Sequence, residues 1–124
     1  EAAIHLAQEG RDVTVVEMLP EVAMDANGRQ RPILLDMLKK LVTVKTGLKG
    51  VRVTEEGLVC QDKSGNEIMF PADTIICAVG QKPRRAVVES LLNTAPIVEE
   101  IGDCVKPQRI AEATFRGLYA ALDI

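Results

Sequence analysis

The sequence has few aromatic residues, no basic excess and no long apolar run. Its 124 residues include two Phe, one Tyr and no Trp, so we expect no aromatic platform for stacking bases or sugars. The formal net charge is −3, whereas a nucleic-acid-binding domain needs clustered positive charge. No apolar run approaches the roughly 18 residues of a membrane-spanning helix. We therefore expect neither nucleic acid nor a membrane as a partner.

The cysteines and the single histidine offer no obvious reactive site. Cys60, Cys77 and Cys104 are odd in number, widely spaced and without a C-x-x-C pair. This pattern fits neither a disulfide scaffold nor a zinc site, and it is typical of a reduced, cytoplasmic protein. Cys60 and Cys77 lie in expected strands, which predicts buried thiols. His5 lies among Ala and Leu, so we expect a surface or packing role rather than catalysis.

What the sequence does contain is a globular balance of 47% apolar and 27% charged residues, on a length that suits one domain. Hydrophobic periodicity and turn residues predict a series of short elements. In chain order these are a helix at 1–9, a strand at 12–17, a helix at 30–41, a short strand at 42–45, three antiparallel strands within 50–70, a strand at 73–79, a helix at 84–92, a strand at 97–101 and a helix at 107–122.

Three patterns determine the expected fold class. Residues 12–17 form a near-continuous β-branched run, which is typical of a parallel strand buried on both faces. In the helix at 30–41 apolar residues recur at helical spacing, and Pro32 falls in the tolerated first turn. The period changes to two between 50 and 70. Together they predict an α/β fold: an incomplete Rossmann-like parallel sheet with an antiparallel meander as its crossover and a C-terminal helix.

Glu17 is the most informative single residue. It ends the strand at 12–17, and in a dinucleotide-binding unit an acidic residue there accepts hydrogen bonds from the adenosine ribose. A 2′-phosphate would meet repulsion from that carboxylate, which favours NADH over NADPH. An ordinary exposed glutamate at a strand end is the alternative. The glycine-rich turn that should precede the first helix is absent, so we expect a segment upstream of Glu1.

Other charged residues have simpler interpretations. Lys39 and Lys40 are expected to be solvated helix charges, as are Arg84 and Arg85, although the arginine pair could instead contact a phosphate. Glu99 and Glu100 are adjacent on an expected strand and would face opposite ways, so joint acid–base work is not expected.

Three separated motifs resemble those of pyridine-nucleotide-dependent flavoprotein reductases. Residues 1–17 look like the stretch that follows the glycine fingerprint, residues 78–83 (AVGQKP) resemble the A-x-G-x-x-P signature that ends the NAD domain, and residues 101–104 (IGDC) resemble the G-D motif at the return into the FAD domain. The whole is most similar to the carboxy-terminal part of NADH:flavin oxidoreductases related to 2,4-dienoyl-CoA reductase and 2-enoate reductase.

The resemblance implies cofactor contacts at particular residues. Glu17 would bind the adenosine ribose with Met18 beside the adenine, and Glu1 would approach the nicotinamide. Gly80 would let the backbone pass close to the nucleotide. The remaining pair serves the flavin: Asp103 would accept a hydrogen bond from an FAD ribityl hydroxyl, and Gly102 would permit close approach. Family members also carry an FMN-binding barrel and an iron–sulfur (4Fe-4S) cluster, whose ligands do not lie in this sequence.

We therefore expect residues 1–83 to be a partial NADH-binding domain and residues 84–124 to return into an FAD-binding domain. The whole would be part of an oxidoreductase that passes hydride from NADH to FAD. Two alternatives stay open: a non-catalytic nucleotide-binding or interaction module, and an NADH oxidase or ferredoxin-reductase-like enzyme. We expect the chain alone to bind cofactors weakly, to lack activity, and to dimerise or swap an element through unpaired strand edges. The substrate is not specified by any residue.

Overall fold

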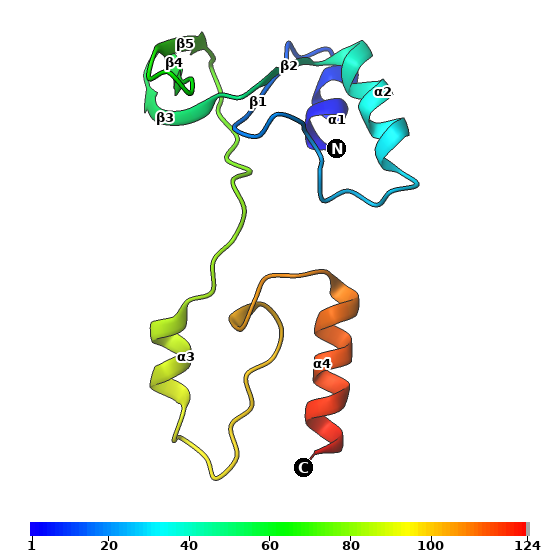
Figure 1. Cartoon of the computed structure of the whole chain (residues 1–124), viewed down its shortest axis with the longest axis vertical. Coiled ribbons are helices and arrows are strands. Elements are labelled where there is room, and N and C mark those ends of the chain that lie inside the picture. Colours follow the sequence, from blue (N-terminus) through cyan, green and yellow to red (C-terminus); the bar gives the residue numbers. More distant parts are fainter. Residues whose placement is uncertain (124) are drawn as a thin grey trace. The chain divides into compact units, whose positions relative to one another are not determined.

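The structure, a computed structural model, describes residues 1–123 and divides into two compact units, Glu1–Ile76 (unit 1) and Cys77–Ile124 (unit 2). Each unit is described by itself. In chain order the elements are α1 (Ala2–Gln8), β1 (Thr14–Glu17), α2 (Arg31–Leu41), β2 (Thr43–Thr46), β3 (Lys49–Thr54), β4 (Gly57–Gln61), β5 (Glu67–Pro71), α3 (Arg85–Leu91), the 3₁₀ turn η1 (Gly102–Cys104) and α4 (Ile110–Leu122) (Figure 1).

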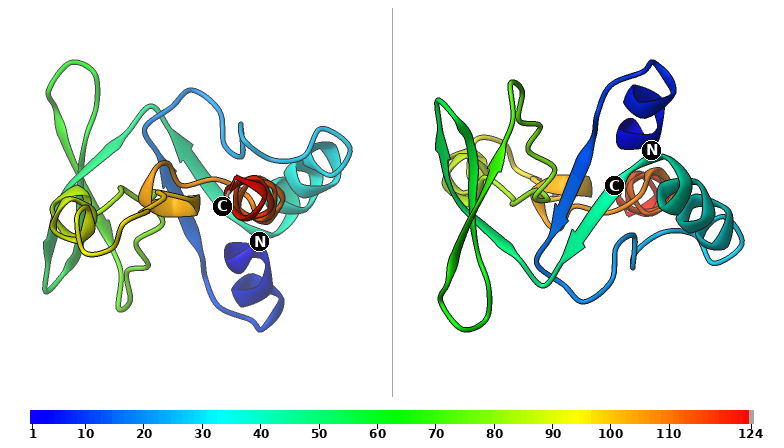
Figure 2. Two further views of the ribbon diagram at one scale, coloured as in Figure 1. Left: turned by 90° about the horizontal axis from the view of Figure 1, so that it is seen from below. Right: turned by 90° about the horizontal axis from the view of Figure 1, so that it is seen from above.

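A parallel pair of strands organises the first half of unit 1. β1 pairs with β2 in a register that runs from Thr14 opposite Thr43 to Glu17 opposite Thr46. The two strands lie side by side in both views of Figure 2. This confirms the α/β class and the predicted parallel strand ending at Glu17. Because both strands run the same way, their carboxyl ends meet at one edge of the pair, where Rossmann-like folds bind ligands.

The core of unit 1 forms where α1 and α2 meet the parallel pair. α2 begins at Arg31 with Pro32 in its first turn, and the basic Lys39 and Lys40 lie in its last turn, where the helix dipole favours positive charge. Its predicted apolar face is confirmed at Leu38, which is buried. The buried cluster consists of Ile4, Leu38 and Val42.

The antiparallel meander forms the second half of unit 1. β3 pairs with β4 and β4 with β5, as the period of two predicts. The pairing of β3 shifts between Gly50 and Arg52, which places a bulge near the start of that strand. On β4, Val59 is 4% exposed and Cys60 is 0% exposed. The predicted burial of the Cys60 thiol is confirmed, and that burial raises its pKa.

Unit 2 contains α3, η1 and α4, and its described residues, 77–123, form no strand. The predicted strand at 73–79 is wrong: Ile76 is 62% exposed and Val79 is 94% exposed. The predicted strand at 97–101 is also wrong. Both segments are apolar enough for a strand, but a strand needs a neighbouring strand to pair its backbone groups, and neither has one within the described residues. Cys77, predicted to be buried, is exposed for the same reason.

Surface features complete the description. His5 is exposed and its Nε2 lies 3.4 Å from Glu9 Oε1, which confirms a surface role. The Lys40 ammonium lies 2.7 Å from the Asp36 carboxylate one helical turn away. In the described part of the chain, no helix combines the length and the apolar composition needed to cross a bilayer.

Candidate functional site

Glu17 lies at the carboxyl end of β1, and its side chain is held by the loop that follows. Its Oε1 accepts a hydrogen bond from the Leu19 backbone N–H at 2.9 Å. Its backbone carbonyl accepts another from the Leu48 N–H at 3.1 Å, which ties the end of β1 to the chain that follows β2. Glu17 is half-buried rather than fully exposed. The carboxylate is therefore held in one orientation at the carboxyl end of the parallel pair.

The two other predicted residues of unit 1 are exposed. Met18 follows Glu17 directly and its side chain is 59% exposed. Glu1 precedes α1, and its carbonyl accepts a hydrogen bond from the His5 N–H at 3.1 Å. Glu17 and Met18 thus lie together at one strand end, with an apolar side chain beside a carboxylate.

Gly80 and Gly102 both adopt backbone conformations that glycine alone adopts freely. Their φ angles are +88° and +66°. A Cβ built on either residue would meet no atom within 4 Å. The chain therefore presents bare backbone at both positions, as close approach to a ligand would require.

Asp103 lies in η1, immediately before the chain leads into α4. Its Oδ1 accepts a hydrogen bond from the Gln108 N–H at 3.3 Å. The Gly102 carbonyl accepts hydrogen bonds from Val105 N–H at 3.1 Å and Lys106 N–H at 3.3 Å. These bonds close a compact turn, which carries Gly102 and Asp103 next to the start of α4. α4 begins at Ile110 rather than at Pro107.

The structure therefore brings the predicted residues into two groups. Glu17 and Met18 lie at the end of β1 in unit 1, and Gly102 and Asp103 lie in η1 of unit 2. Glu1 and Gly80 each lie apart from these pairs along the chain.

Sequence reasoning missed an ion pair that holds the η1 region of unit 2. Arg85, expected to be a solvated helix charge, donates to both carboxylate oxygens of Glu100, at 3.2 Å for the Nη2–Oε1 contact, and to the Cys104 carbonyl at 3.5 Å. The hydrogen bond from Arg85 lowers the pKa of Glu100 and raises that of the Arg85 guanidinium. No local sequence pattern predicts this ion pair, because Arg85 and Glu100 lie 15 residues apart in the chain.

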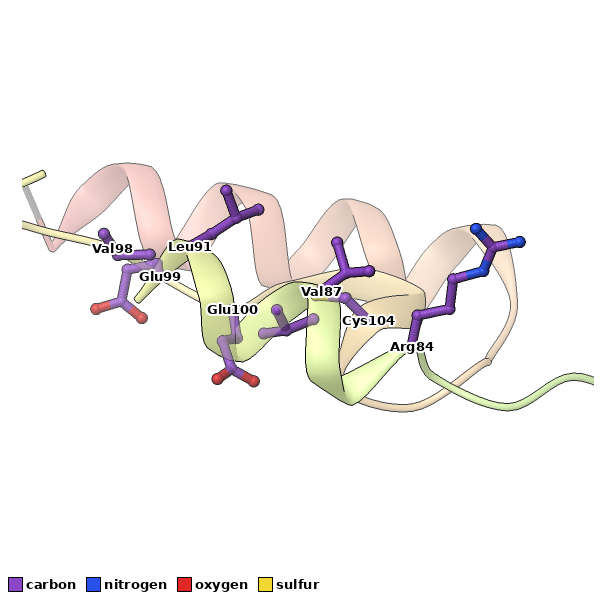
Figure 3. Close-up of a pocket in the computed structure, with 8 residues that line it drawn as sticks. Arg84, Val87, Leu91, Val98, Glu99, Glu100 and Cys104 are labelled. Carbon is purple, nitrogen blue, oxygen red and sulfur yellow. The ribbon is translucent and has the colours of Figure 1, made fainter. Parts of the chain in front are cut away.

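A shallow apolar groove of about 280 Å³ lies within unit 2 between α3 and the chain before η1. In Figure 3, the side chains of Val87 and Leu91 follow one another along α3, and Arg84 lies at one end of the groove. The carboxylates of Glu99 and Glu100 point away from these apolar side chains (Figure 3). None of the predicted cofactor residues lines this groove, so it offers no support for the site.

Metal binding finds no support in residues 1–123. No group of three or more His, Cys, Asp or Glu side chains gathers there in a way that could hold an ion.

Comparisons with known proteins agree with the α/β fold. The bilirubin reductase of Mediterraneibacter gnavus is 32% identical over 105 residues, which is 84% of this chain and 16% of that protein. The NADH oxidase of Thermoanaerobacter brockii is 29% identical over 126 residues, covering 100% of this chain and 19% of that protein. A solved structure of a 2-naphthoyl-CoA reductase complex matches 98% of this chain and 19% of its own chain, with a TM-score of 0.82 at 24% identity.

The chain thus spans less than a fifth of the length of these relatives. The structural likeness supports the Rossmann-like α/β fold, and the relatives are oxidoreductases by name. The sequence profile of one family, described as pyridine nucleotide-disulphide oxidoreductase, matches residues 1–96, which is most of the chain. On that match, this chain belongs to the pyridine nucleotide-disulphide oxidoreductase family.

Proposed function

We propose that this chain contributes to the NADH and FAD sites of a flavin-dependent oxidoreductase, with residues 1–83 on the NADH side and residues 84–124 on the FAD side. The observation that carries the proposal is the position of Glu17: an oriented carboxylate at the carboxyl end of a parallel strand, in a chain of this family. The NADH oxidase among the relatives supports NADH as the nucleotide.

Glu17 would bind the adenosine ribose. A carboxylate accepts hydrogen bonds from two neighbouring hydroxyls, and the Leu19 N–H already fixes one of its oxygens at 2.9 Å. A ribose with a 2′-phosphate would place negative charge against this carboxylate, so Glu17 favours NADH over NADPH. Met18, 59% exposed beside it, offers apolar surface to the adenine.

We assign the remaining predicted residues to the hydride donor, NADH, and to the hydride acceptor, FAD. Glu1 would lie toward the nicotinamide, and Gly80, with φ of +88°, would let the backbone approach the nucleotide. Asp103 would accept a hydrogen bond from the FAD ribityl chain, next to the bare backbone of Gly102. Bound NADH would supply a hydride to FAD, and this chain's residues would bind and orient the two cofactors.

For the enzyme as a whole we propose a reductase similar to enoate and dienoyl-CoA reductases, with FMN and a 4Fe-4S cluster bound outside these 124 residues. A bilirubin reductase and a 2-naphthoyl-CoA reductase among the similar proteins support a reductase. An NADH oxidase is the second candidate, because such an enzyme matches 100% of this chain.

The experiment uses the polypeptide as its gene encodes it, with flavin absorbance as the signal. We expect NADH to bleach the flavin and NADPH to do so poorly. Glu17→Ala should raise KM for NADH by about tenfold or more, since one charged hydrogen-bond partner is worth roughly 1.5–3 kcal/mol and about 1.4 kcal/mol is a factor of ten. Glu55→Ala, which removes an exposed carboxylate from the turn between β3 and β4, is the matched control.

Equal use of NADH and NADPH, or a Glu17→Ala variant with unchanged KM, would contradict the assignment of Glu17. If the reduced flavin then reduces an unsaturated thioester or acid, the enzyme is a reductase. If it consumes oxygen without such a substrate, the enzyme is an oxidase. A protein that binds NADH without bleaching any flavin would be a non-catalytic nucleotide-binding module.

We propose further that the 124-residue chain alone binds NADH weakly and self-associates. β1 and β2 form a sheet of only two strands within the described residues, which leaves both outer edges open to another chain. Light scattering and calorimetry test this. A monodisperse monomer that binds NADH tightly would contradict both parts.

A further inference from the structure

The loop between β1 and α2 follows directly on the strand end that carries Glu17. It runs from Met18 to Gln30 without helix or strand and begins directly after Glu17 (Figure 1). Three of its apolar side chains are exposed: Met18 at 59%, Leu19 at 45% and Met24 at 56%. Because these side chains are exposed, their packing does little to stabilise the loop. Other contacts must therefore hold its shape.

Arg31, the first residue of α2, supplies those contacts. Its Nε donates to the Ala23 carbonyl at 3.1 Å, and its Nη2 donates to the Val22 carbonyl at 3.3 Å. The same Nη2 lies 2.6 Å from the Glu21 carboxylate. The side chain is only 29% exposed. One guanidinium thus binds three consecutive residues of the loop, which a flexible surface arginine would not do.

Ala23 shows why the loop needs this support. Its φ is +55°, in the left-handed region that alanine rarely adopts. Such a conformation persists only when surrounding contacts fix it. The Arg31 Nε hydrogen bond to the Ala23 carbonyl is a contact of this kind.

The loop is also held from its inner side. Val22 packs against the cluster of Ile4, Leu38 and Val42. The side chain of Val22 therefore joins the core while its carbonyl binds Arg31. Val22 is thus fixed from two directions, which limits the conformations open to the four residues between it and Glu17.

We propose that Arg31 is a positioning residue for dinucleotide binding: it holds the loop in the shape in which Glu17 and Met18 receive the adenosine half. This rests on the proposed function of Glu17. Arg31 acts through the loop in this proposal and not by contact with the cofactor, since its Nε and Nη2 donate to loop residues. Without Arg31 the loop samples many conformations, and binding must order it again at a cost in affinity.

Loss of Arg31 should affect binding of the adenosine half of NADH and not that of the nicotinamide half. The loop contacts only the adenosine half, so the loss of Arg31 should weaken NADH without affecting a donor that lacks adenosine. We expect Arg31→Ala to raise KM for NADH about tenfold with kcat unchanged, and to leave the reaction with reduced nicotinamide mononucleotide unaltered. Arg31→Lys keeps the positive charge on a single ammonium group but lacks the several fixed N–H donors of the guanidinium. It should therefore give an intermediate KM for NADH.

The experiment measures flavin reduction in the polypeptide as its gene encodes it, with NADH and with reduced nicotinamide mononucleotide, and inhibition by ADP-ribose. Arg31→Ala should weaken ADP-ribose inhibition by the same factor as it raises KM for NADH. Arg52→Ala is the matched control: it removes an arginine whose Nη2 lies 3.3 Å from Glu67 in the meander, away from the loop. It should change none of these values.

The outcomes separate this proposal from the one it rests on. If ADP-ribose does not inhibit the unmodified protein, the adenosine site itself is refuted and Arg31 with it. If it does inhibit, and Arg31→Ala leaves KM for NADH unchanged or impairs both donors equally, the positioning role alone is refuted. Should Arg31→Ala fail to fold, Glu21→Gln removes only the carboxylate anchor of Arg31, and a smaller rise in KM for NADH alone is expected; no rise would refute the proposal.

Discussion

Unit 1 and unit 2 differ in what holds them together. The buried apolar residues are all in unit 1 and are Ile4, Leu38, Val42, Val59 and Cys60. None of the described residues of unit 2, 77–123, is buried. Its α4 leaves Ile110 86% exposed and Leu122 70% exposed. Burial of apolar side chains therefore stabilises unit 1. Unit 2 has no such core among its described residues; it contains local helices and the partly exposed Arg85–Glu100 ion pair.

The largest difference should appear in thiol reactivity. Cys60 in unit 1 is 0% exposed, and Cys77 in unit 2 is exposed. A disulfide reagent added to the native protein should label Cys77 at the rate of a free thiol. Cys60 should react about a thousandfold more slowly, because it must wait for an opening that costs roughly 4 kcal/mol. Equal labelling rates would mean that unit 1 has no stable core.

Two glycines give the next largest contrast. Gly57 in the meander has φ of +145°, and a Cβ there would lie 2.1 Å from the Phe70 carbonyl oxygen. Gly80 in unit 2 has φ of +88° with no atom within 4 Å of an added Cβ. Gly57→Ala should lower the free energy of unfolding by about 3 kcal/mol or more, and Gly80→Ala by about 1 kcal/mol from backbone strain alone. Urea denaturation measures both, and similar losses would show that the clash at Gly57 is relieved.

Two leucines in helices test burial directly. Leu38 in α2 is 7% exposed and Leu118 in α4 is 53% exposed. Leu38→Ala should cost about 2–4 kcal/mol of unfolding free energy, because it leaves a cavity between α1, α2 and Val42. Leu118→Ala makes the same change of helix propensity and should cost less than about 0.5 kcal/mol. A comparable loss at Leu118 would show that α4 is covered in solution.

The smallest effect concerns pH and unit 2. Arg85 lowers the pKa of Glu100, so the ion pair stabilises the folded state above the usual glutamate pKa of about 4.3. Its contribution is lost as pH falls through the lowered value. NMR titration should find Glu100 ionising below the usual range, and Arg85→Ala should restore an ordinary pKa. An unchanged titration in the variant would mean that the pair does not form in solution.

Local patterns in the sequence predicted most of the elements of unit 1. The β-branched run ending at Glu17, the apolar face of α2 and the alternation around Cys60 each correspond to an element in the structure. These elements form because each has a partner within unit 1. The expected burial of β1 on both faces is wrong: Thr14 is exposed and the rest of the strand is half-buried.

The same reasoning failed where an apolar run has no partner strand. Residues 73–79 and 97–101 resemble strands, yet Val79 is 94% exposed and Ile97 is 60% exposed. For the site, the position of Glu17 was predictable from its strand. The hydrogen bonds of Arg31 and Arg85 were not predictable, because their partners are set by how loops fold back, which hydrophobic periodicity does not encode.

The register of unit 1 has a consequence for the order in which it folds. The meander joins neighbouring strands through tight turns, whereas the parallel pair requires Thr14 to meet Thr43 across the loop and α2. Closing that larger loop costs more chain entropy before any contact compensates for it. We expect the meander to form early and the parallel pair to limit the rate, so that inserting glycines into the β1–α2 loop should slow refolding more than inserting them at Ser64.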